Sequence, residues 1–203
     1  MPKPRTAALT SLLSALLLVA STLVVIAAPR NLPATPEACS ELIINGNFES
    51  GGANWTQEGG NGVQLISTFN PRTGQYSADL GGQNTANHSI RQQFTVPPNS
   101  IVTLSFWWEQ WTQETAPSTK DYLAVNVLGS NGALLTELAR LGVDPDRPPW
   151  EQLTFSLSAY AGDTVQLQFK GVNDELLPSE FFVDDVSITV CTAKHIYLPL
   201  IRR

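Results

Sequence analysis

The feature that most constrains the fold is a series of short segments in which apolar and polar residues alternate. Alternation with a period of two puts the apolar side chains on one face of an extended chain, so each segment predicts a half-buried β-strand. The segments are 42–44, 63–69, 76–80, 90–96, 102–108, 123–127, 153–157, 165–169 and 182–190. Clusters of turn-forming residues lie between them.

About nine short strands within roughly 150 residues predict an all-β protein. The strand pattern alone leaves a sandwich, a jelly roll and a barrel open. Beyond the first 28 residues, only 133–141 is a candidate for helical periodicity, and it fits a strand and loop equally well. A chain of 203 residues favours one domain with appendages.

The N-terminus predicts export. Lys3 and Arg5 precede an uncharged segment, 7–28, which is long for a signal peptide and long enough for a membrane span. We therefore expect 1–28 to be a signal peptide or an N-terminal membrane anchor, with the remainder secreted or at the cell surface. Residues 29–38 contain three prolines and predict a linker.

The chain has only two cysteines, Cys39 and Cys191, at the two ends of the patterned region. An exported protein meets an oxidising compartment, so we expect the two to form a disulfide, with two free buried thiols as the alternative. The pair delimits a module over 39–191. The tail over 192–203 is apolar with a basic end, and it is too short to span a membrane.

The charge of the module argues against nucleic acid as a ligand. Between Cys39 and Cys191 there are 17 Asp and Glu residues against 6 Lys and Arg residues, a net charge of −11. Binding to a phosphate backbone requires Lys and Arg to displace its counterions. An acidic surface suits neutral sugars or cations.

We expect no catalytic activity. The module contains a single histidine, His88, and neither a G-x-S-x-G motif nor a zinc peptidase motif. Paired carboxylates for glycoside hydrolysis are the alternative that a sequence leaves open, because any two acids can meet in space.

A tryptophan-rich segment predicts a ligand-binding face. On a strand over 102–112, Trp107, Glu109 and Trp111 share the face opposite the apolar side chains. Indole rings can stack on the C–H face of a sugar, while Glu109 and Gln113 hydrogen-bond its hydroxyls. We expect neighbouring strands to add Arg91, Gln93, Tyr122 and Asn126. The alternative is that the long loop over 113–120 covers a tryptophan.

Two motifs at opposite ends of the module carry a family resemblance. Residues 42–49 read LIINGNFE, residues 181–188 read FFVDDVSI, and GQYS, LSF and LSAYAG lie between them. This order resembles the CenC-type carbohydrate-binding modules and, more broadly, the galactose-binding-like jelly-roll superfamily. The resemblance covers 39–191 and implies a two-sheet antiparallel β-sandwich of jelly-roll type.

The resemblance also implies a structural Ca²⁺ that ties the first strand to the last. The implied carboxylate ligands are Glu49 and Asp184, with backbone carbonyls of Asn47, Thr73 and Tyr76 completing the shell. Calcium takes about six to eight oxygen ligands, which this set supplies in part. The alternative is that the two acids are solvated or hydrogen-bonded at strand ends.

We therefore expect a secreted, non-catalytic carbohydrate-binding module with a structural calcium site and a polysaccharide or glycan as its partner. The alternative is a structural or adhesive cell-envelope module that binds a protein. Buried indoles at Trp107 and Trp111 would favour the alternative. We expect contact with a membrane only through an N-terminal anchor.

Overall fold

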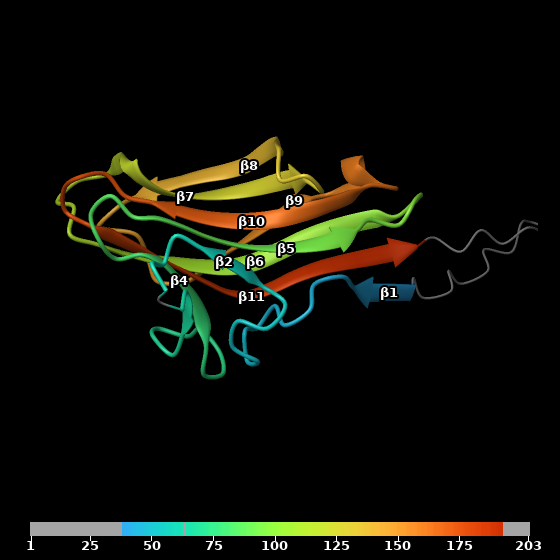
Figure 1. Ribbon diagram of the computed structural model, residues 1–203, viewed down its shortest axis with the longest axis horizontal. Coiled ribbons are helices and arrows are strands. Elements are labelled where there is room, and N and C mark those ends of the chain that lie inside the picture. The colour runs from blue at the N-terminus through green and yellow to red at the C-terminus, as the bar shows by residue number, and fades with distance from the viewer. Residues whose placement is uncertain (1–37, 63, 193–203) are drawn as a thin grey trace, which may run out of the picture. The chain divides into compact units, whose positions relative to one another are not determined.

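A computed structural model describes residues 38–62 and 64–192, which form two facing antiparallel sheets (Figure 1). The first sheet contains β1 (Ala38–Glu41), β3 (Ile66–Ser67), β4 (Ser77–Gly81), β6 (Ile101–Thr112), β9 (Glu151–Ser156) and β11 (Ser179–Thr192). Its order is β3-β4-β11-β6-β9, and β1 pairs with β11 beside this path. The second sheet contains β2 (Thr56–Glu58), β5 (Asn87–Thr95), β7 (Ser118–Gly129), β8 (Leu134–Val143) and β10 (Thr164–Val172). Its order is β2-β5-β10-β7-β8.

This architecture confirms the predicted fold class, a two-sheet antiparallel β-sandwich of jelly-roll type. The ambiguous segment 133–141 lies almost entirely in strand β8. Segment 42–44 lies outside any strand, because the chain turns at Asn45, which has a positive φ of 57°. The helical structure of the described residues is one 3₁₀ turn, η1 (Ser158–Tyr160). Among those residues, no helix is long and apolar enough to cross a membrane.

The core lies between the inner faces of the two sheets. Leu104, Phe106 and Trp108 alternate along β6 and are almost completely buried, as are Leu167 and Phe169 on β10. The rings of Phe106 and Phe169 meet across the sandwich edge to face, with their centroids 4.9 Å apart. Each fully buried side chain of this size contributes about 1.5–3 kcal/mol to the free energy of folding. The apolar residues of the period-two pattern are therefore the residues whose burial stabilises the core.

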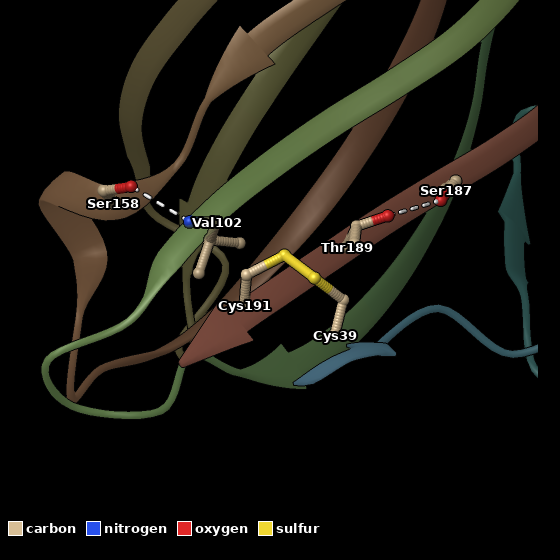
Figure 2. Close-up of a disulfide and its surroundings, with 6 residues drawn as sticks. All are labelled: Cys39, Val102, Ser158, Ser187, Thr189 and Cys191. Carbon is tan, nitrogen blue, oxygen red and sulfur yellow. Dashed lines mark hydrogen bonds between the residues drawn. A yellow bond between two sulfur atoms is a disulfide. The ribbon is translucent and has the colours of Figure 1, made fainter. Parts of the chain in front are cut away.

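The predicted disulfide is present. Cys39 and Cys191 are register partners on the antiparallel strands β1 and β11, and their Cα atoms lie 4.2 Å apart (Figure 2). The bond joins positions separated by 152 residues and so closes almost the whole module into a loop. The first and last strands of the sandwich are therefore covalently linked.

Beyond the disulfide, the two motifs of the sequence resemblance lie side by side along what we call the seam, where the Leu42 N–H donates to the carbonyl of Ile188 at 3.0 Å. The register of β11 shifts between Asp184 and Ser187, and within this irregularity the Val186 N–H donates to the carbonyl of Gly46 at 2.9 Å. A Cβ atom on Gly46 would overlap the carbonyl oxygen of Val186. The NGNF turn and the bulged DDV segment therefore fit together only with glycine at position 46.

The described strands extend one residue beyond the predicted module at each end, from Ala38 to Thr192. The predicted signal peptide or anchor over 1–28, nearly all of the linker over 29–38 and the tail from residue 193 lie outside the described residues.

Candidate functional site

The structure divides the eight predicted ligand-binding residues between the two sheets. Trp107, Glu109 and Trp111 lie on β6, and Gln113 directly follows that strand, which belongs to the first sheet. The other predicted residues are Arg91 and Gln93 on β5 and Tyr122 and Asn126 on β7, in the second sheet. The expectation that β5 and β7 neighbour β6 was therefore wrong, because the sandwich stacks these strands in separate layers. The predicted residues lie on two opposite outer faces.

Amide and guanidinium groups stand side by side on the outer face of the second sheet. Strand β10 lies between β5 and β7, and its register places Gln168 opposite both Arg91 and Asn126. In a neighbouring row, Gln166 is opposite Gln93. We call these five residues the amide face.

Hydrogen bonds hold part of the amide face in place. The Asn126 side-chain amide donates to Gln168 Oε1 at 3.0 Å. Asn126 is only 6% exposed, and its Oδ1 atom has no hydrogen-bond partner among the described residues. Gln166 Nε2 donates to the carbonyl of Ser130 at 3.1 Å. The face is thus partly pre-ordered and retains an unused acceptor.

Salt bridges border the amide face on both sides. On one side Arg91 binds Glu58 at 2.6 Å, and this hydrogen bond lowers the pKa of Glu58. On the other side Arg140 binds Glu137 at 2.8 Å, and the hydrogen bond from Arg140 likewise lowers the pKa of Glu137. The guanidinium of Arg140 also lies 4.0 Å from the ring centre of Tyr122, so it covers one face of this predicted ligand-binding residue.

A cavity of about 450 Å³ opens beside the amide face. Its lining residues are Ile44, Asn54, Thr56, Arg91, Gln92, Gln93 and Gln166. Gln92 points toward the core and exchanges two hydrogen bonds with the Ile44 backbone, at 2.8 and 2.9 Å, which fixes the turn that carries Ile44. This volume lies within the range of small-ligand sites, about 300–1,000 Å³. The exposed aliphatic side chain of Ile44 and the polar rows together form one open site.

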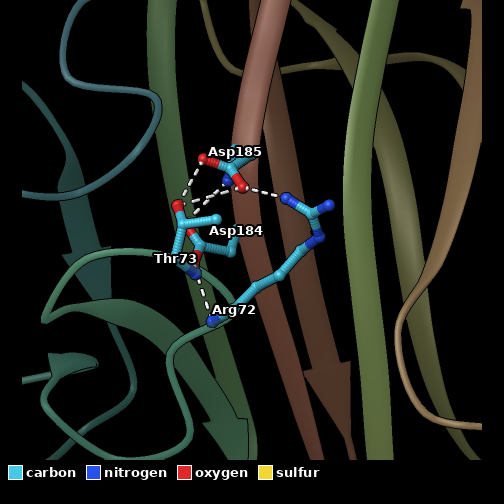
Figure 3. Close-up of polar contacts among 4 residues, drawn as sticks. All are labelled: Arg72, Thr73, Asp184 and Asp185. Atoms are coloured by element: carbon cyan, nitrogen blue, oxygen red, sulfur yellow. Dashed lines mark hydrogen bonds and ion pairs between the residues drawn. The ribbon is translucent and has the colours of Figure 1, made fainter.

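On the opposite face, Trp107 is covered by a loop rather than available for stacking. The guanidinium of Arg72 lies 3.7 Å from the centre of its ring. The same guanidinium binds Asp185 at 2.6 Å, and the loop backbone is held by Asp184 (Figure 3). The sequence alternative placed a covering loop at 113–120, whereas the covering residue comes from the loop before β4.

Trp111 is the open member of the pair, with 44% of its surface exposed. Phe69 and Phe182 contact it edge to face, each with ring centroids 5.1 Å away. Its Nε1 donates to Glu109 Oε1 at 3.3 Å, and Asn70 donates to the other Glu109 oxygen at 3.1 Å. The two predicted tryptophans therefore differ, because Trp107 is covered and Trp111 reaches the surface.

The two carboxylates of the predicted calcium site both accept hydrogen bonds from the backbone of the loop over residues 72–76. Asp184 is fully buried, and its Oδ2 atom accepts hydrogen bonds from the Arg72 and Thr73 backbone at 2.9 and 3.1 Å. Burial raises the pKa of Asp184 to about 6. Glu49 Oε1 accepts hydrogen bonds from the N–H groups of Gln75 and Tyr76 at 2.8 and 3.0 Å. Residues from both ends of the module thus meet on this loop.

The family model of the carbohydrate binding domain (CBM_4_9) matches residues 40–175 of the chain. The chain belongs to this carbohydrate-binding family. The match includes every strand of the amide face and stops short of β11, so the family assignment and the geometry of the second sheet refer to the same part of the protein. Among curated proteins, none matches the chain.

Solved structures share the fold of this carbohydrate-binding domain. A family 61 carbohydrate-binding module, TmCBM61, in complex with β-1,4-galactotriose superposes with a TM-score of 0.52 at 13% identity, covering 73% of this chain and 97% of that one. The K3 adhesin domain of Lys-gingipain from Porphyromonas gingivalis gives 0.53 at 16% identity, with 75% and 99% covered. The tandem CBM22-1–CBM22-2 domain of Paenibacillus barcinonensis Xyn10C gives 0.53 at 21% identity, with 79% and 48% covered. Identities this low establish the fold alone.

Sequence reasoning missed two residues at the centre of the amide face of this carbohydrate-binding domain. Gln166 and Gln168 alternate with the buried Val165, Leu167 and Phe169 along β10, so their outward position was readable from the sequence. The alternation does not show that β10 lies between β5 and β7. Without that pairing, nothing connects the two glutamines with Arg91 and Asn126.

The carbohydrate-binding domain also has a second carboxylate pair that the sequence did not single out. Asp79 and Glu180 line a cavity of about 230 Å³ together with His88. Burial and the neighbouring Glu180 raise the pKa of Asp79 to about 7. Burial lowers the pKa of His88, whose Nδ1 accepts a hydrogen bond from the Gly81 N–H at 3.2 Å. The buried imidazole of His88 therefore has a structural role, because it accepts a hydrogen bond from the backbone of β4.

Proposed function

We propose that the domain binds a neutral polysaccharide on the amide face, outside the cell and without catalysis. The observation that carries this proposal is the register of three adjacent strands, which sets Arg91, Gln168 and Asn126 in one row and Gln93 and Gln166 in the next. Side-chain amides both donate and accept hydrogen bonds, as sugar hydroxyls do. An array of them along one face of a sheet suits an extended chain of sugars.

The unused Oδ1 atom of Asn126 supports a hydroxyl-bearing ligand at this position. A buried acceptor without a partner costs about 1–3 kcal/mol, and a sugar hydroxyl that donates to it would remove that cost. The electrostatics support a neutral sugar, because Glu58 already neutralises Arg91 and the module as a whole carries a net charge of −11. An anionic polysaccharide would be repelled.

The ion pairs of the two nearest acids support binding over hydrolysis at the amide face itself. A glycoside hydrolase needs one carboxylic acid that stays protonated near neutral pH, which requires a raised pKa. The pKa values of Glu58 and Glu137, the acids that border the amide face, are lowered by their arginine partners. Neither is suited to act as the general acid.

Two substitutions on the amide face test the proposal. We expect Gln168→Ala to weaken polysaccharide binding about tenfold, or about 1.4 kcal/mol, because it removes hydrogen bonds to the ligand and releases Asn126. We expect combined Arg91→Ala and Gln168→Ala substitutions to remove measurable binding at the amide face. Isothermal titration calorimetry with a soluble neutral polysaccharide measures both effects.

The matched control is Gln152→Ala, which changes an exposed glutamine on β9 in the other sheet. Binding at the amide face should be unchanged in this variant. A double variant that is folded and binds at full stoichiometry with wild-type affinity would contradict the proposal. A folded wild-type protein that binds no polysaccharide would favour the alternative of a structural or adhesive module with a protein partner.

We propose further that Ca²⁺ stabilises the seam between Glu49 and Asp184. The donor chemistry fits, since carboxylate oxygens with the carbonyls of Asn47, Thr73 and Tyr76 form an all-oxygen set of the kind calcium prefers. The desolvated carboxylate of Asp184 would gain from a nearby cation. The absence of a side chain at Gly74 lets the Glu49 carboxylate approach the loop backbone, because a Cβ atom there would overlap the carboxylate.

Removal of calcium is the test of this second proposal. A ligand at about 100 times its Kd stabilises the native state by about 2.7 kcal/mol, so we expect a chelator to lower the Tm by about 5–10 °C. Asp184→Asn should abolish the difference between calcium and chelator, whereas Glu151→Gln, an exposed acid on β9, should keep it. An unchanged wild-type Tm on chelation would count against a calcium site.

Export is part of the proposed function. A disulfide between Cys39 and Cys191 persists in an oxidising compartment, which supports a secreted or cell-surface location. The segment 1–28, as a signal peptide or an anchor, would supply the route.

A further inference from the structure

We propose a second saccharide-binding site around Trp111, on the sheet opposite the amide face, so that one domain can hold two glycan chains. The ligand class is a neutral sugar ring. The inference rests on the proposed function only for this class of ligand, since Trp111 belongs to β6 in the first sheet and the amide face belongs to the second.

Trp111 is a fixed aromatic surface. Trp111 exposes 44% of its surface and contacts Phe69, which exposes 46%, so the two rings form an apolar patch of the kind that marks interaction sites. Phe69 and Phe182 meet the indole at interplanar angles of 83° and 69°, and Glu109 accepts its N–H. These contacts hold the ring in one orientation, which is the property that a stacking platform needs.

Clefts flank Trp111 on both sides. One has a volume of about 350 Å³, and its lining includes Glu109, Asp144 and Arg147. The other has a volume of about 240 Å³, and its lining includes Gln113 and Glu180. Trp111 lines both clefts. The larger volume is within the range of small-ligand sites.

The larger cleft offers hydrogen-bond donors and acceptors beside the aromatic ring. Arg147 is held by Glu151 at 2.9 Å and by the ring of Trp108 at 4.7 Å. A guanidinium has five N–H donors, and the hydrogen bond from Arg147 Nη1 to Glu151 uses one of them. Glu109 uses one hydrogen bond at each oxygen and so retains accepting capacity. An aromatic ring flanked by both kinds of group matches a pyranose, which has an apolar C–H face and hydroxyl edges.

The charges of the cleft select a neutral sugar. Arg147 is already paired with Glu151, while Glu109 and Asp144 remain as acids around the cleft. A uronic acid would meet uncompensated negative charge there. Because the two sites lie on opposite outer faces, a domain with both occupied would link two polysaccharide chains, and this linkage increases avidity for a multivalent matrix.

Stoichiometry of binding tests the inference. The probe is a short neutral oligosaccharide cut from the polysaccharide that the wild-type protein binds, titrated by calorimetry. We expect two equivalents per wild-type chain, one after Trp111→Ala, one after the combined Arg91→Ala and Gln168→Ala substitutions, and none when all three are combined. Trp111→Phe keeps an aromatic face and should retain the second equivalent with weaker affinity, and Leu176→Ala, at a residue that is 64% exposed, is the control for loss of apolar surface.

The outcomes separate this inference from the proposed function. One equivalent that disappears with the Arg91 and Gln168 substitutions and is unchanged by Trp111→Ala overturns the second site and leaves the proposed function intact. One equivalent that disappears only with Trp111→Ala supports the Trp111 site and overturns the amide face. Absence of binding by folded wild-type protein overturns both. Clouding of a polysaccharide solution by the wild-type protein, lost in either single-site variant, is the expected sign of cross-linking.

Discussion

Replacing Gly46 by alanine is expected to lower the free energy of unfolding by about 3 kcal/mol or more. The added Cβ atom would overlap the carbonyl oxygen of Val186, which is backbone and has no rotamer into which it can move. Separation of the two segments would also lengthen the 2.9 Å hydrogen bond from Val186 N to the Gly46 carbonyl. The effect is large because it acts on a close backbone contact between the first and last motifs of the module.

Chemical denaturation followed by tryptophan fluorescence measures this change. Gly132→Ala is the matched control, because Gly132 has a positive φ of 83° with open space around the missing Cβ atom. That substitution should cost only the backbone strain of alanine in the left-handed region, about 1 kcal/mol. Equal destabilisation by the two substitutions would show that the close approach of Val186 does not require glycine at position 46.

Combined Cys39→Ser and Cys191→Ser substitutions should lower the free energy of unfolding by about 5 kcal/mol. The disulfide joins positions separated by 152 residues, so it removes more chain entropy from the unfolded state than a short loop would. The native strand pairing between β1 and β11 survives the substitution, because backbone hydrogen bonds maintain the register of Ala38 to Glu41. The loss therefore arises mainly in the unfolded state.

Denaturation of the double variant and of wild type, each with and without reductant, measures the contribution of the disulfide. Reduced wild type and the double variant should unfold at the same denaturant concentration, well below that of oxidised wild type. A difference of less than about 1 kcal/mol between oxidised wild type and the variant would contradict the chain-entropy argument.

The fold was largely predictable because burial imposes period-two alternation on strands with one buried face. Strands β6 and β10 illustrate this, since every second residue over much of their length is buried. Strand β8 was ambiguous because it lies at the edge of its sheet and does not bury one face. Its consecutive residues Leu134 and Leu135 are both exposed, so its sequence shows no period-two alternation. Within residues 64–69 of the predicted segment 63–69, the strand is limited to the two residues of β3, and Phe69 lies outside the sheet and packs on Trp111.

The site was predictable only in part because strand neighbours are set by pairing between distant segments. Parity along one strand identified Arg91 and Gln93 as outward-facing, but no local signal reveals that β10 supplies the residues opposite them. The cover over Trp107 comes from Arg72, which is far away in the sequence and becomes a neighbour only when the loop is fixed by Asp184. The calcium site remains a prediction that rests on the donor set.

The most direct test of the central claim, polysaccharide binding on the amide face, is a screen of the purified protein on immobilised neutral and anionic polysaccharides. Wild type, the combined Arg91→Ala and Gln168→Ala variant, and the Gln152→Ala control would be compared side by side. We expect wild type and the control to bind a neutral polysaccharide, with no retention on uronates, and the double variant to be much weaker. Equal retention of all three folded proteins, or preferential retention on anionic polysaccharides, would contradict the claim.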